Sequence, residues 1–301
     1  MQVQVPASSA NLGPGFDSFG LALSMHDRYV AQVLDDAVLD IDVTGEGADE
    51  VPLTDKNLLV KAMYKGFDFL GGRPKGLAIR ALNVNPHGRG LGSSASAIIG
   101  GLVLARSLVL NGEDHMNDIQ LLSLATDMEG HPDNVSAALF GGATISWFEM
   151  DKNKSSAHCV HLNVDPRIQA IAYIPSKALA TSKARKMLPE TIPHKDAVNN
   201  SINAALLTQA LTVRPDLLLT ATHDYVHQSY REAAMPKSYA LMQKLRAAGV
   251  AAFISGAGPT VLALLVDADL NHELGDLVRA AGSGFEVENL DISSVGYQVS
   301  N

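Results

Sequence analysis

Short apolar runs, several of them alternating with polar residues, predict the strands in the first half of the chain. The clearest alternation is in LAIRALNV, residues 77–84, with the period of two that is typical of a half-buried strand. Similar runs predict further strands over residues 3–5, 29–34, 38–43 and 140–148. The first half of the chain is therefore predicted to contain a sheet.

Longer stretches with helical periodicity predict helices over residues 55–70, 93–111 and 117–129. Thr54 is the expected N-cap of the first helix, which ends before two glycines. Asn117 and Gln120 are spaced as a capping box at the start of the third, and Gly130 is placed to end it. The first half is therefore predicted to combine helices with its sheet.

The second half predicts a separate unit. Strands are predicted over residues 168–174, 251–254, 260–266 and 292–299, and helices over residues 194–248 and 270–281. This order is the β-α-β-β-α-β pattern of a ferredoxin-like fold. The polar run MDKNKSSA, residues 150–157, is the predicted junction. The fold class is therefore α+β, with domains over residues 1–155 and 156–301.

Composition narrows the range of partners. The 301 residues are 47% hydrophobic and 18% charged, which is typical of a globular enzyme. A net charge of −9 lacks the positive field that attracts nucleic acid or anionic membranes. The single cysteine, Cys159, cannot form an internal disulfide, and the longest near-apolar stretch, residues 95–105, is shorter than the ~18 residues of a membrane span. We expect a cytoplasmic protein that binds neither nucleic acid nor membrane.

The most informative segment is VNPHGRGLGSSASAIIGG, residues 84–101, in which a glycine-rich loop follows a predicted strand and leads into a helix near Ser93. Such a loop offers unpaired backbone N–H groups and the positive end of a helix dipole, which suit a phosphate. A flexible turn with a serine cap is the plainer alternative.

Two familiar phosphate loops can be compared with this segment. A Walker A loop requires Gly-Lys, a dipeptide that the chain lacks. Residues 90–95 do match the G-x-G-x-x-A fingerprint of dinucleotide-binding proteins, but the predicted helix is followed by the polar segment NGEDHMNDIQ instead of an apolar strand. A dehydrogenase is therefore only a distant alternative.

Three other segments gather glycines with polar side chains: PASSANLGPGFDSFG (6–20), EGHPDNVSAALFGG (129–142) and ISGAGPTVLALL (254–265). The first contains Asn11 and Asp17, and the second contains Glu129 and Asp133. Taken singly, each segment also fits a structural role, as a loop, a helix–helix turn and a hairpin respectively.

Together with TSKARKMLP (181–189) and HQSYR (227–231), these segments resemble the motif set of the small-molecule kinase superfamily named after galactokinase, homoserine kinase, mevalonate kinase and phosphomevalonate kinase. GLGSSA and SGAGPT identify the superfamily. The first motif, EGHPDNV and HQSYR are most similar to those of the homoserine kinases. The chain departs from the common pattern at Ser96, Ser136 and Ser229, where no chemistry is expected.

The resemblance implies a fold and an activity. The N-terminal ATP-binding domain would contain a left-handed βαβ unit, against the usual right-handed rule, and the C-terminal domain would be ferredoxin-like. The activity would be the ATP-dependent phosphorylation of L-homoserine to O-phospho-L-homoserine, a step of threonine biosynthesis. A homodimer is also implied.

The resemblance implies a nucleotide site in which Mg²⁺ is held by the Ser94 hydroxyl and the Glu129 carboxylate and keeps several waters. Asn57 would contact adenine, although its place near a helix start also suits a cap. The residues implied to hold the phosphates are Gly88, Arg89, Gly90, Leu91, Gly92, Ser93, Ser94 and Ala95.

L-Homoserine carries an ammonium group, a carboxylate and a hydroxyl, so its site needs acidic, basic and neutral groups together. The residues implied to bind it are Asn11, Asp17, Asp133, Arg185 and Arg231. The planar guanidinium groups of the two arginines suit the carboxylate.

Asp133 and Arg185 are the expected catalytic residues. Asp133 is compatible with two roles, a general base as in relatives similar to mevalonate kinase, or an anchor for the substrate. Arg185 would support the transferring phosphoryl group. His131 fits either a base or a loop hydrogen-bonding residue. Two alternatives to the whole reading are a kinase of the same superfamily for another small alcohol, and a nucleotide-binding sensor without activity.

Overall fold

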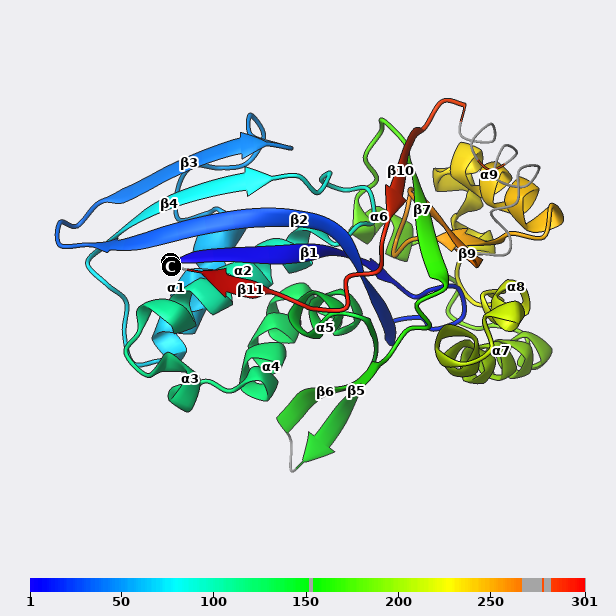
Figure 1. Cartoon of the computed structure of the whole chain (residues 1–301), viewed down its shortest axis with the longest axis horizontal. Coiled ribbons are helices and arrows are strands. Elements are labelled where there is room, and N and C mark those ends of the chain that lie inside the picture. The colour runs from blue at the N-terminus through cyan, green and yellow to red at the C-terminus, as the bar shows by residue number, and fades with distance from the viewer. Residues whose placement is uncertain (152–153, 267–277, 279–282, 301) are drawn as a thin grey trace.

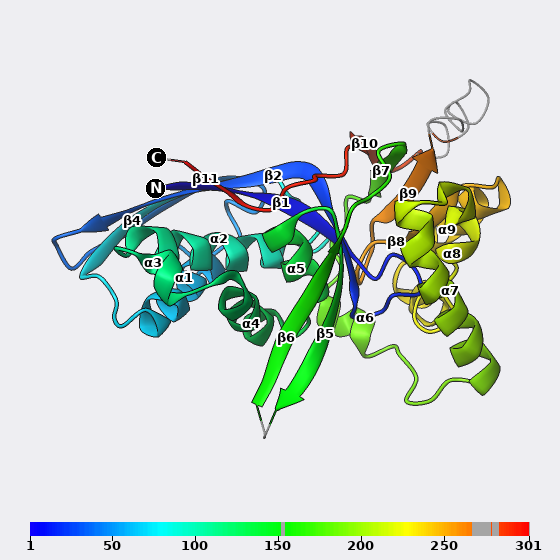
Figure 2. The same cartoon turned by 60° about the horizontal axis from the view of Figure 1, so that its bottom comes forward.

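The N-terminal half forms a twisted sheet with helices on one face (Figures 1 and 2). The computed structural model describes residues 1–151, 154–266, 278 and 283–300. In this part of the chain the sheet has seven strands, ordered β11-β1-β2-β4-β3, with β5 paired to β2 and β6. They are β1 (Gln2–Ala10), β2 (Phe19–Leu34), β3 (Leu39–Gly45), β4 (Gly76–Asn83), β5 (Ala143–Asp151), β6 (Lys154–Leu162) and β11 (Gln298–Ser300).

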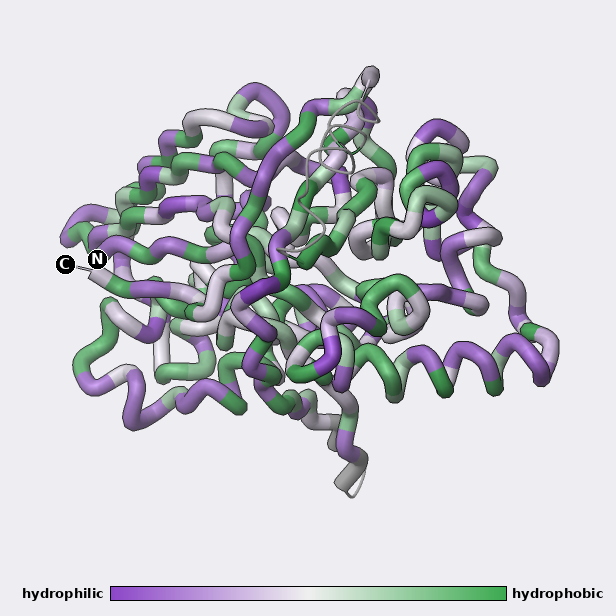
Figure 3. The backbone as a smooth tube through the Cα atoms, turned by 45° about the vertical axis from the view of Figure 1, so that its right-hand side comes forward, coloured by the Kyte–Doolittle hydropathy of each residue, from purple (hydrophilic) through white to green (hydrophobic). Residues whose placement is uncertain are grey.

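Strands β3 and β4 are parallel, and α1 (Leu58–Phe69) connects them on the helix-covered face. This is the expected βαβ unit, and its crossover is left-handed (Figure 1). The other strand pairs of this sheet are antiparallel. Figure 3 shows hydrophilic and hydrophobic positions alternating along the strands that run toward the termini, so one face of the sheet meets the helices.

Helix α2 (Ser93–Leu108) is the central helix of this layer and is buried along most of its length. It packs against α1 and contacts α3 (Gly112–His115), α4 (Asp118–Glu129) and α5 (Asp133–Phe140). Among the described residues, no helix is both long and apolar enough to cross a membrane.

The C-terminal half forms a four-stranded antiparallel sheet ordered β10-β7-β9-β8, which is the strand order of the predicted ferredoxin-like fold. Its strands are β7 (Ile168–Ile174), β8 (Ala251–Ile254), β9 (Val261–Val266) and β10 (Glu286–Leu290). The described helices of this half are α6 (Thr181–Arg185), α7 (His194–Thr212), η1 (Pro215–Leu217), α8 (Leu218–Ala221), η2 (Ser229–Ala234) and α9 (Pro236–Ala247).

Several predicted elements need correction. Helix α1 is capped by Asn57 instead of Thr54, since the Asn57 side chain accepts from the N–H of Leu59. Residues 150–157, the predicted junction, lie within the β5–β6 hairpin as far as they are described. The chain passes from one sheet to the other over residues 163–167, and the division at 155/156 remains a prediction.

The predicted last strand, residues 292–299, also differs from the structure. The fourth strand of the C-terminal sheet is β10, and the chain then returns to the first sheet, where β11 pairs with β1. The helix predicted over residues 270–281 lies outside the described residues except for residue 278.

Candidate active site

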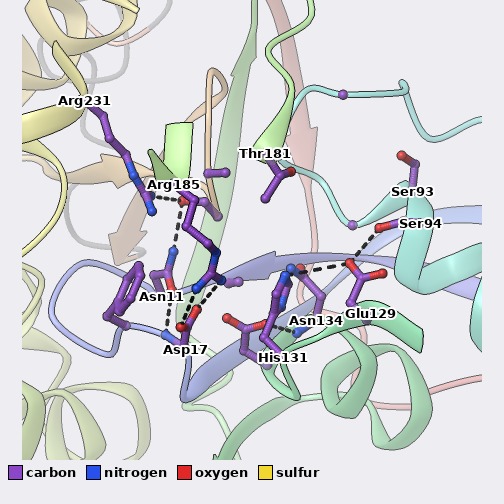
Figure 4. A pocket seen from close by; sticks show the side chains of 18 residues that line it. Asn11, Asp17, Ser93, Ser94, Glu129, His131, Asn134, Thr181, Arg185 and Arg231 are labelled. Carbon is purple, nitrogen blue, oxygen red and sulfur yellow. Dashed lines mark hydrogen bonds and ion pairs between the residues drawn. The ribbon is translucent and has the colours of Figure 1, made fainter. Parts of the chain in front are cut away.

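A cavity of about 200 Å³ lies where the two halves of the chain meet (Figure 4). Its walls come from the first loop of the chain (residues 11–18), the loop before α2 and the start of that helix, the α4–α5 turn, α6, η2 and the β8–β9 loop. The lining residues are Ala10, Asn11, Phe16, Asp17, Gly88, Gly90, Gly92, Ser93, Ser94, Glu129, His131, Asp133, Asn134, Thr181, Arg185, Arg231, Gly256 and Ala257.

The glycine loop, residues 84–92, forms one wall of the cavity. The backbone N–H groups of Val84 and Asn85 both donate to the buried carboxylate of Asp27, at 2.7 and 2.9 Å. Gly92 is the N-cap of α2, in the left-handed conformation with φ +73°. It has no side chain to cap the helix, so the first N–H groups of α2 are left for an anion.

A hydroxyl and a carboxylate meet beside this helix start. The Ser94 hydroxyl donates to Oε1 of Glu129 at 2.6 Å. Burial raises the pKa of Glu129, and the hydrogen bond from Ser94 offsets part of that rise. The two predicted metal ligands are thus in direct contact.

His131 lies between two carboxylates at the α4–α5 turn. Its Nδ1 is 2.6 Å from Oδ1 of Asp133, and its Nε2 is 4.0 Å from Oε1 of Glu129. Burial by itself would lower the pKa of His131, but the hydrogen bond and charge of Asp133 and the charge of Glu129 raise it overall. The two carboxylates thus stabilise the charged form of the imidazole, which links the Ser94–Glu129 pair to Asp133.

Asp17 and Arg185 form a bidentate ion pair across the cavity, with N–O distances of 2.7 and 2.9 Å (Figure 4). Asp17 raises the pKa of Arg185 through this hydrogen bonding. Asn11 accepts from the N–H of Asp17 at 3.0 Å and donates to the carbonyl of Gly256 at 2.9 Å. Asn11 and Asp17 both have positive φ, at 71° and 55°, a strain that is frequent at functional sites.

Arg231 enters the cavity from the C-terminal half and is buried. Its guanidinium carbon lies 5.4 Å from the ring centroid of Phe16, and that of Arg185 lies 5.5 Å from the same ring. Burial lowers the pKa of Arg231 to about 10, and the charge of Arg185 adds to this effect. The cavity thus brings two cations together next to one aromatic ring.

A second cavity, of about 320 Å³, lies on the other side of Ser93 and Ser94, which line both cavities. Its other walls are mainly apolar and include Tyr29, Ile41, Val43 and Pro52. Asn57 lines it as well, but both of its polar groups already have partners, the N–H of Leu59 and the carbonyl of Pro52, each at 3.0 Å. The structure therefore supports the capping role of Asn57 and leaves contact with a base untested.

Only some of the predicted phosphate-binding residues line the first cavity. Gly88, Gly90, Gly92, Ser93 and Ser94 line the first cavity. Leu91 and Ala95 have fully buried side chains, so only their backbone groups could contact a ligand. The Arg89 guanidinium donates to the carbonyls of His87 and Ser176, at 2.6 and 2.7 Å, and its side chain does not line the cavity.

All five predicted substrate residues line the cavity, and so do residues that sequence reasoning gave no role. These are Ala10, Phe16, Asn134, Thr181, Gly256 and Ala257. Each lies inside or beside one of the segments quoted for the resemblance. Phe16 has no polar atom to suggest a site, and its position beneath two arginines emerges only from the fold.

Comparison with known proteins gives the family. The model of the GHMP kinases N terminal domain matches residues 57–142, and that of the GHMP kinases C terminal matches residues 207–284. The homoserine kinases of Streptomyces avermitilis and Streptomyces coelicolor are 47% and 48% identical over 299 residues, which is 99% of this chain and 95% and 94% of theirs. The crystal structure of homoserine kinase from Cytophaga hutchinsonii, 25% identical, has a TM-score of 0.85 and covers 100% of this chain and 97% of its own. The chain therefore belongs to the homoserine kinase family of the GHMP kinases.

Proposed function

We propose that this protein transfers the γ-phosphoryl group of ATP to the hydroxyl of L-homoserine, giving O-phospho-L-homoserine for threonine biosynthesis. One observation carries the proposal beyond family membership. The same cavity joins an anion-binding helix start to an acidic and basic cluster that suits an amino acid. The near full-length similarity to homoserine kinases supports this substrate.

The nucleotide would bind across the glycine loop. The apolar cavity beyond Ser93 and Ser94 suits the base, and the N-terminus of α2 suits the phosphates. A magnesium ion fits the contact between Ser94 and Glu129, because both groups are hard oxygen ligands and Mg²⁺ keeps several waters. Within the described residues, no three Asp, Glu, His or Cys side chains are grouped as a metal site. A bound ion would supply charge neutralisation for the phosphates.

The acceptor would bind between Asp17 and the two arginines. The Asp17 carboxylate suits the substrate ammonium, and Arg185 and Arg231 suit the substrate carboxylate. Asp17 and Arg185 neutralise each other in the free site, so each is held in place before the zwitterion arrives. A zwitterionic substrate would then replace the contact between Asp17 and Arg185 by two new ion pairs, from its ammonium to Asp17 and from its carboxylate to Arg185.

The transfer itself needs alignment and charge neutralisation more than covalent chemistry. The homoserine hydroxyl oxygen forms a bond to the γ-phosphorus while the bond to the β,γ-bridging oxygen breaks and ADP leaves. The hydroxyl proton passes to Asp133 or to the transferring phosphate. Asp133 is buried at the start of α5 and lines the cavity, so its place is compatible with both roles.

Two other properties belong to the same proposal. The chain would act in the cytoplasm and would form a homodimer, as the family resemblance implies. Size-exclusion chromatography with light scattering measures the second property directly, and a monomer at micromolar concentration would refute it.

A substrate panel that follows ADP release tests the proposed function. We expect L-homoserine to give the highest kcat/KM, ahead of mevalonate, 4-hydroxybutyrate and the amino alcohol in which the carboxylate is reduced. A higher kcat/KM for one of the other alcohols would favour a sister kinase. ATP binding without phosphorylation of any alcohol would favour the sensor.

A further inference from the structure

The buried guanidinium of Arg231 is held from one side. Nη1 donates to Nδ1 of His227 and to the carbonyl oxygen of Gly256, both at 3.2 Å. Nε is buried and has no hydrogen-bond partner among the described residues. A second edge of the same group is therefore kept for a ligand in the cavity that Arg231 lines.

The hydrogen bonds of His227 define its tautomer. Its Nε2 lies 2.7 Å from the carbonyl oxygen of Gly13, which can only accept, so Nε2 carries the hydrogen. Nδ1 then has a lone pair and accepts from Arg231. Complete burial lowers the pKa of His227, and the charge of Arg231 lowers it further, against the opposing charge of Asp224. The neutral ring is thus the form that fits beside a buried cation.

Asp224 is an acidic group close to this ring, with Oδ1 3.5 Å from Nε2. Its carboxylate already accepts from the backbone N–H groups of Val226, His227 and Gln228, at 2.7 to 3.1 Å. It therefore fixes the backbone that presents His227, while Gly13 takes the hydrogen of the ring.

We propose that His227 is a positioning residue: its neutral ring holds Nη1 of Arg231 so that the remaining edge of the guanidinium meets the substrate carboxylate. The inference rests on the proposed function, in which Arg231 binds that carboxylate. The same ring, through Gly13, ties Arg231 to the loop that carries Asn11 and Asp17. Arg231, which faces the carboxylate of the substrate, and Asp17, which faces its ammonium group, are thereby held at a fixed distance from each other.

Two substitutions separate the two hydrogen bonds. His227→Asn places an amide oxygen near the position of Nδ1 and keeps an acceptor for Arg231. His227→Gln places an amide nitrogen near the position of Nε2 and keeps a donor for Gly13. We expect His227→Gln to raise the KM for L-homoserine about tenfold, with kcat and the KM for ATP within twofold of wild type. His227→Asn should raise the homoserine KM less than threefold.

The amino alcohol that lacks the carboxylate is a control that separates lost carboxylate binding from a general distortion of the site. Because it offers nothing for Arg231 to bind, its KM should be the same in wild type and in His227→Gln. An equal rise in KM for both acceptors would show a general distortion of the site and overturn the inference. So would an unchanged homoserine KM in His227→Gln, or a larger effect in His227→Asn than in His227→Gln.

The tautomer gives a test that does not depend on the folding of the variants. In wild-type protein labelled with ¹⁵N-histidine, NMR should find His227 neutral and protonated at Nε2 at pH 7. A charged ring or an Nδ1–H tautomer would overturn the inference while leaving the proposed function intact. Failure of the wild type to phosphorylate L-homoserine would instead overturn the proposed function, and the inference with it.

Discussion

The largely buried carboxylate of Glu129 lies beside a hydroxyl and a histidine, and this arrangement gives the first prediction. Ser94→Ala and Glu129→Gln should each raise the Mg²⁺ concentration needed for half-maximal turnover by about tenfold, because each removes one oxygen ligand. Titration of activity with Mg²⁺ at saturating ATP measures the change. Ser93→Ala is the matched control, since Ser93 lines both cavities but makes no described bond to Glu129. Wild-type Mg²⁺ dependence in either folded variant would rule out that residue as a ligand.

Asp133 allows the roles of anchor and base to be separated by kinetics. Its Oδ1 accepts from His131 and from the N–H of Asn134, both within 2.7 Å, and no hydrogen bond to Oδ2 is found among the described residues. Oδ2 is thus the oxygen that could bind a ligand. We expect Asp133→Asn to raise the homoserine KM with a much smaller change in kcat, because uniform binding is lost. Steady-state kinetics at varied homoserine concentration measure KM and kcat and so distinguish the two roles. A large fall in kcat at near-normal KM would assign the base instead.

The two arginines predict a dependence on the substrate carboxylate. Arg231→Leu should raise the homoserine KM by ten- to a hundred-fold with little effect on the KM for ATP, because a charge-assisted contact is lost. Arg185→Leu should raise it as well, and should lower kcat if its charge supports the transferring phosphoryl group. Arg80→Leu, in an exposed pair with Asp40, is the control for a lost ion pair away from the site. Normal homoserine KM values in both site variants would refute the carboxylate clamp.

The sequence could identify these side chains only through motifs. An arginine at position 185 or 231 is, by itself, more typical of a solvated surface. No spacing relates Asp17, Arg185 and Phe16, because their meeting depends on how two separate sheets pack. The resemblance implies that Ser94 and Glu129 bind one metal ion, but it gave no contact between them. Their hydrogen bond became visible only in the fold.

At the scale of elements, the glycine loop predicts a stability difference between two glycines of similar conformation. Gly90 and Gly249 have φ of +79° and +89°, so an alanine is strained at both, by about 1–2 kcal/mol. A Cβ at Gly249 meets open space, whereas one at Gly90 would overlap the carbonyl oxygen of Ser255. Urea unfolding should therefore show a larger loss of stability for Gly90→Ala than for Gly249→Ala.

ATP kinetics complete this comparison. Gly90→Ala should also raise the KM for ATP, because the loop must move away from the β8–β9 turn to make room for the methyl group. Gly249 follows α9 and lines neither of the two cavities of the site, so Gly249→Ala should leave that KM unchanged. Equal effects of the two substitutions on stability and on KM would show that the loop is not tightly held.

Elements with local signals were predicted best. Helix α4 has its capping box at Asn117 and Gln120 and its terminating Gly130, as expected, because these signals lie within a few residues of each other. Strand β2 runs over 16 residues, and only residues 29–34 were predicted, because its first five residues are all buried and do not alternate. The β5–β6 hairpin is polar enough to resemble a linker, and the return of β11 to β1 depends on pairing across the whole chain.

At the scale of the whole molecule, the chain crosses between the two sheets more than once. It leaves the first sheet after β6, forms the second, and returns to the first as β11. The first loop and the end of β1 are in turn held by the second half: Asn11 bonds to Gly256, Gly13 to His227, and Ser9 of β1 to Ser255. Both predicted domains therefore contribute residues to the same cavity.

This shared cavity limits how the enzyme could be recombined with its relatives. A chimera joined at 155/156 would take Asn11, Asp17 and Asp133 from one parent and both arginines from the other. If the parents phosphorylate different alcohols, the hybrid inherits half of each recognition set and should use neither substrate well, even when it folds. To exchange the acceptor preference, a chimera should instead have the first loop and the segments around Arg185 and Arg231 all replaced together. The residues that determine acceptor specificity are therefore far apart in the sequence, although they form a single site in space.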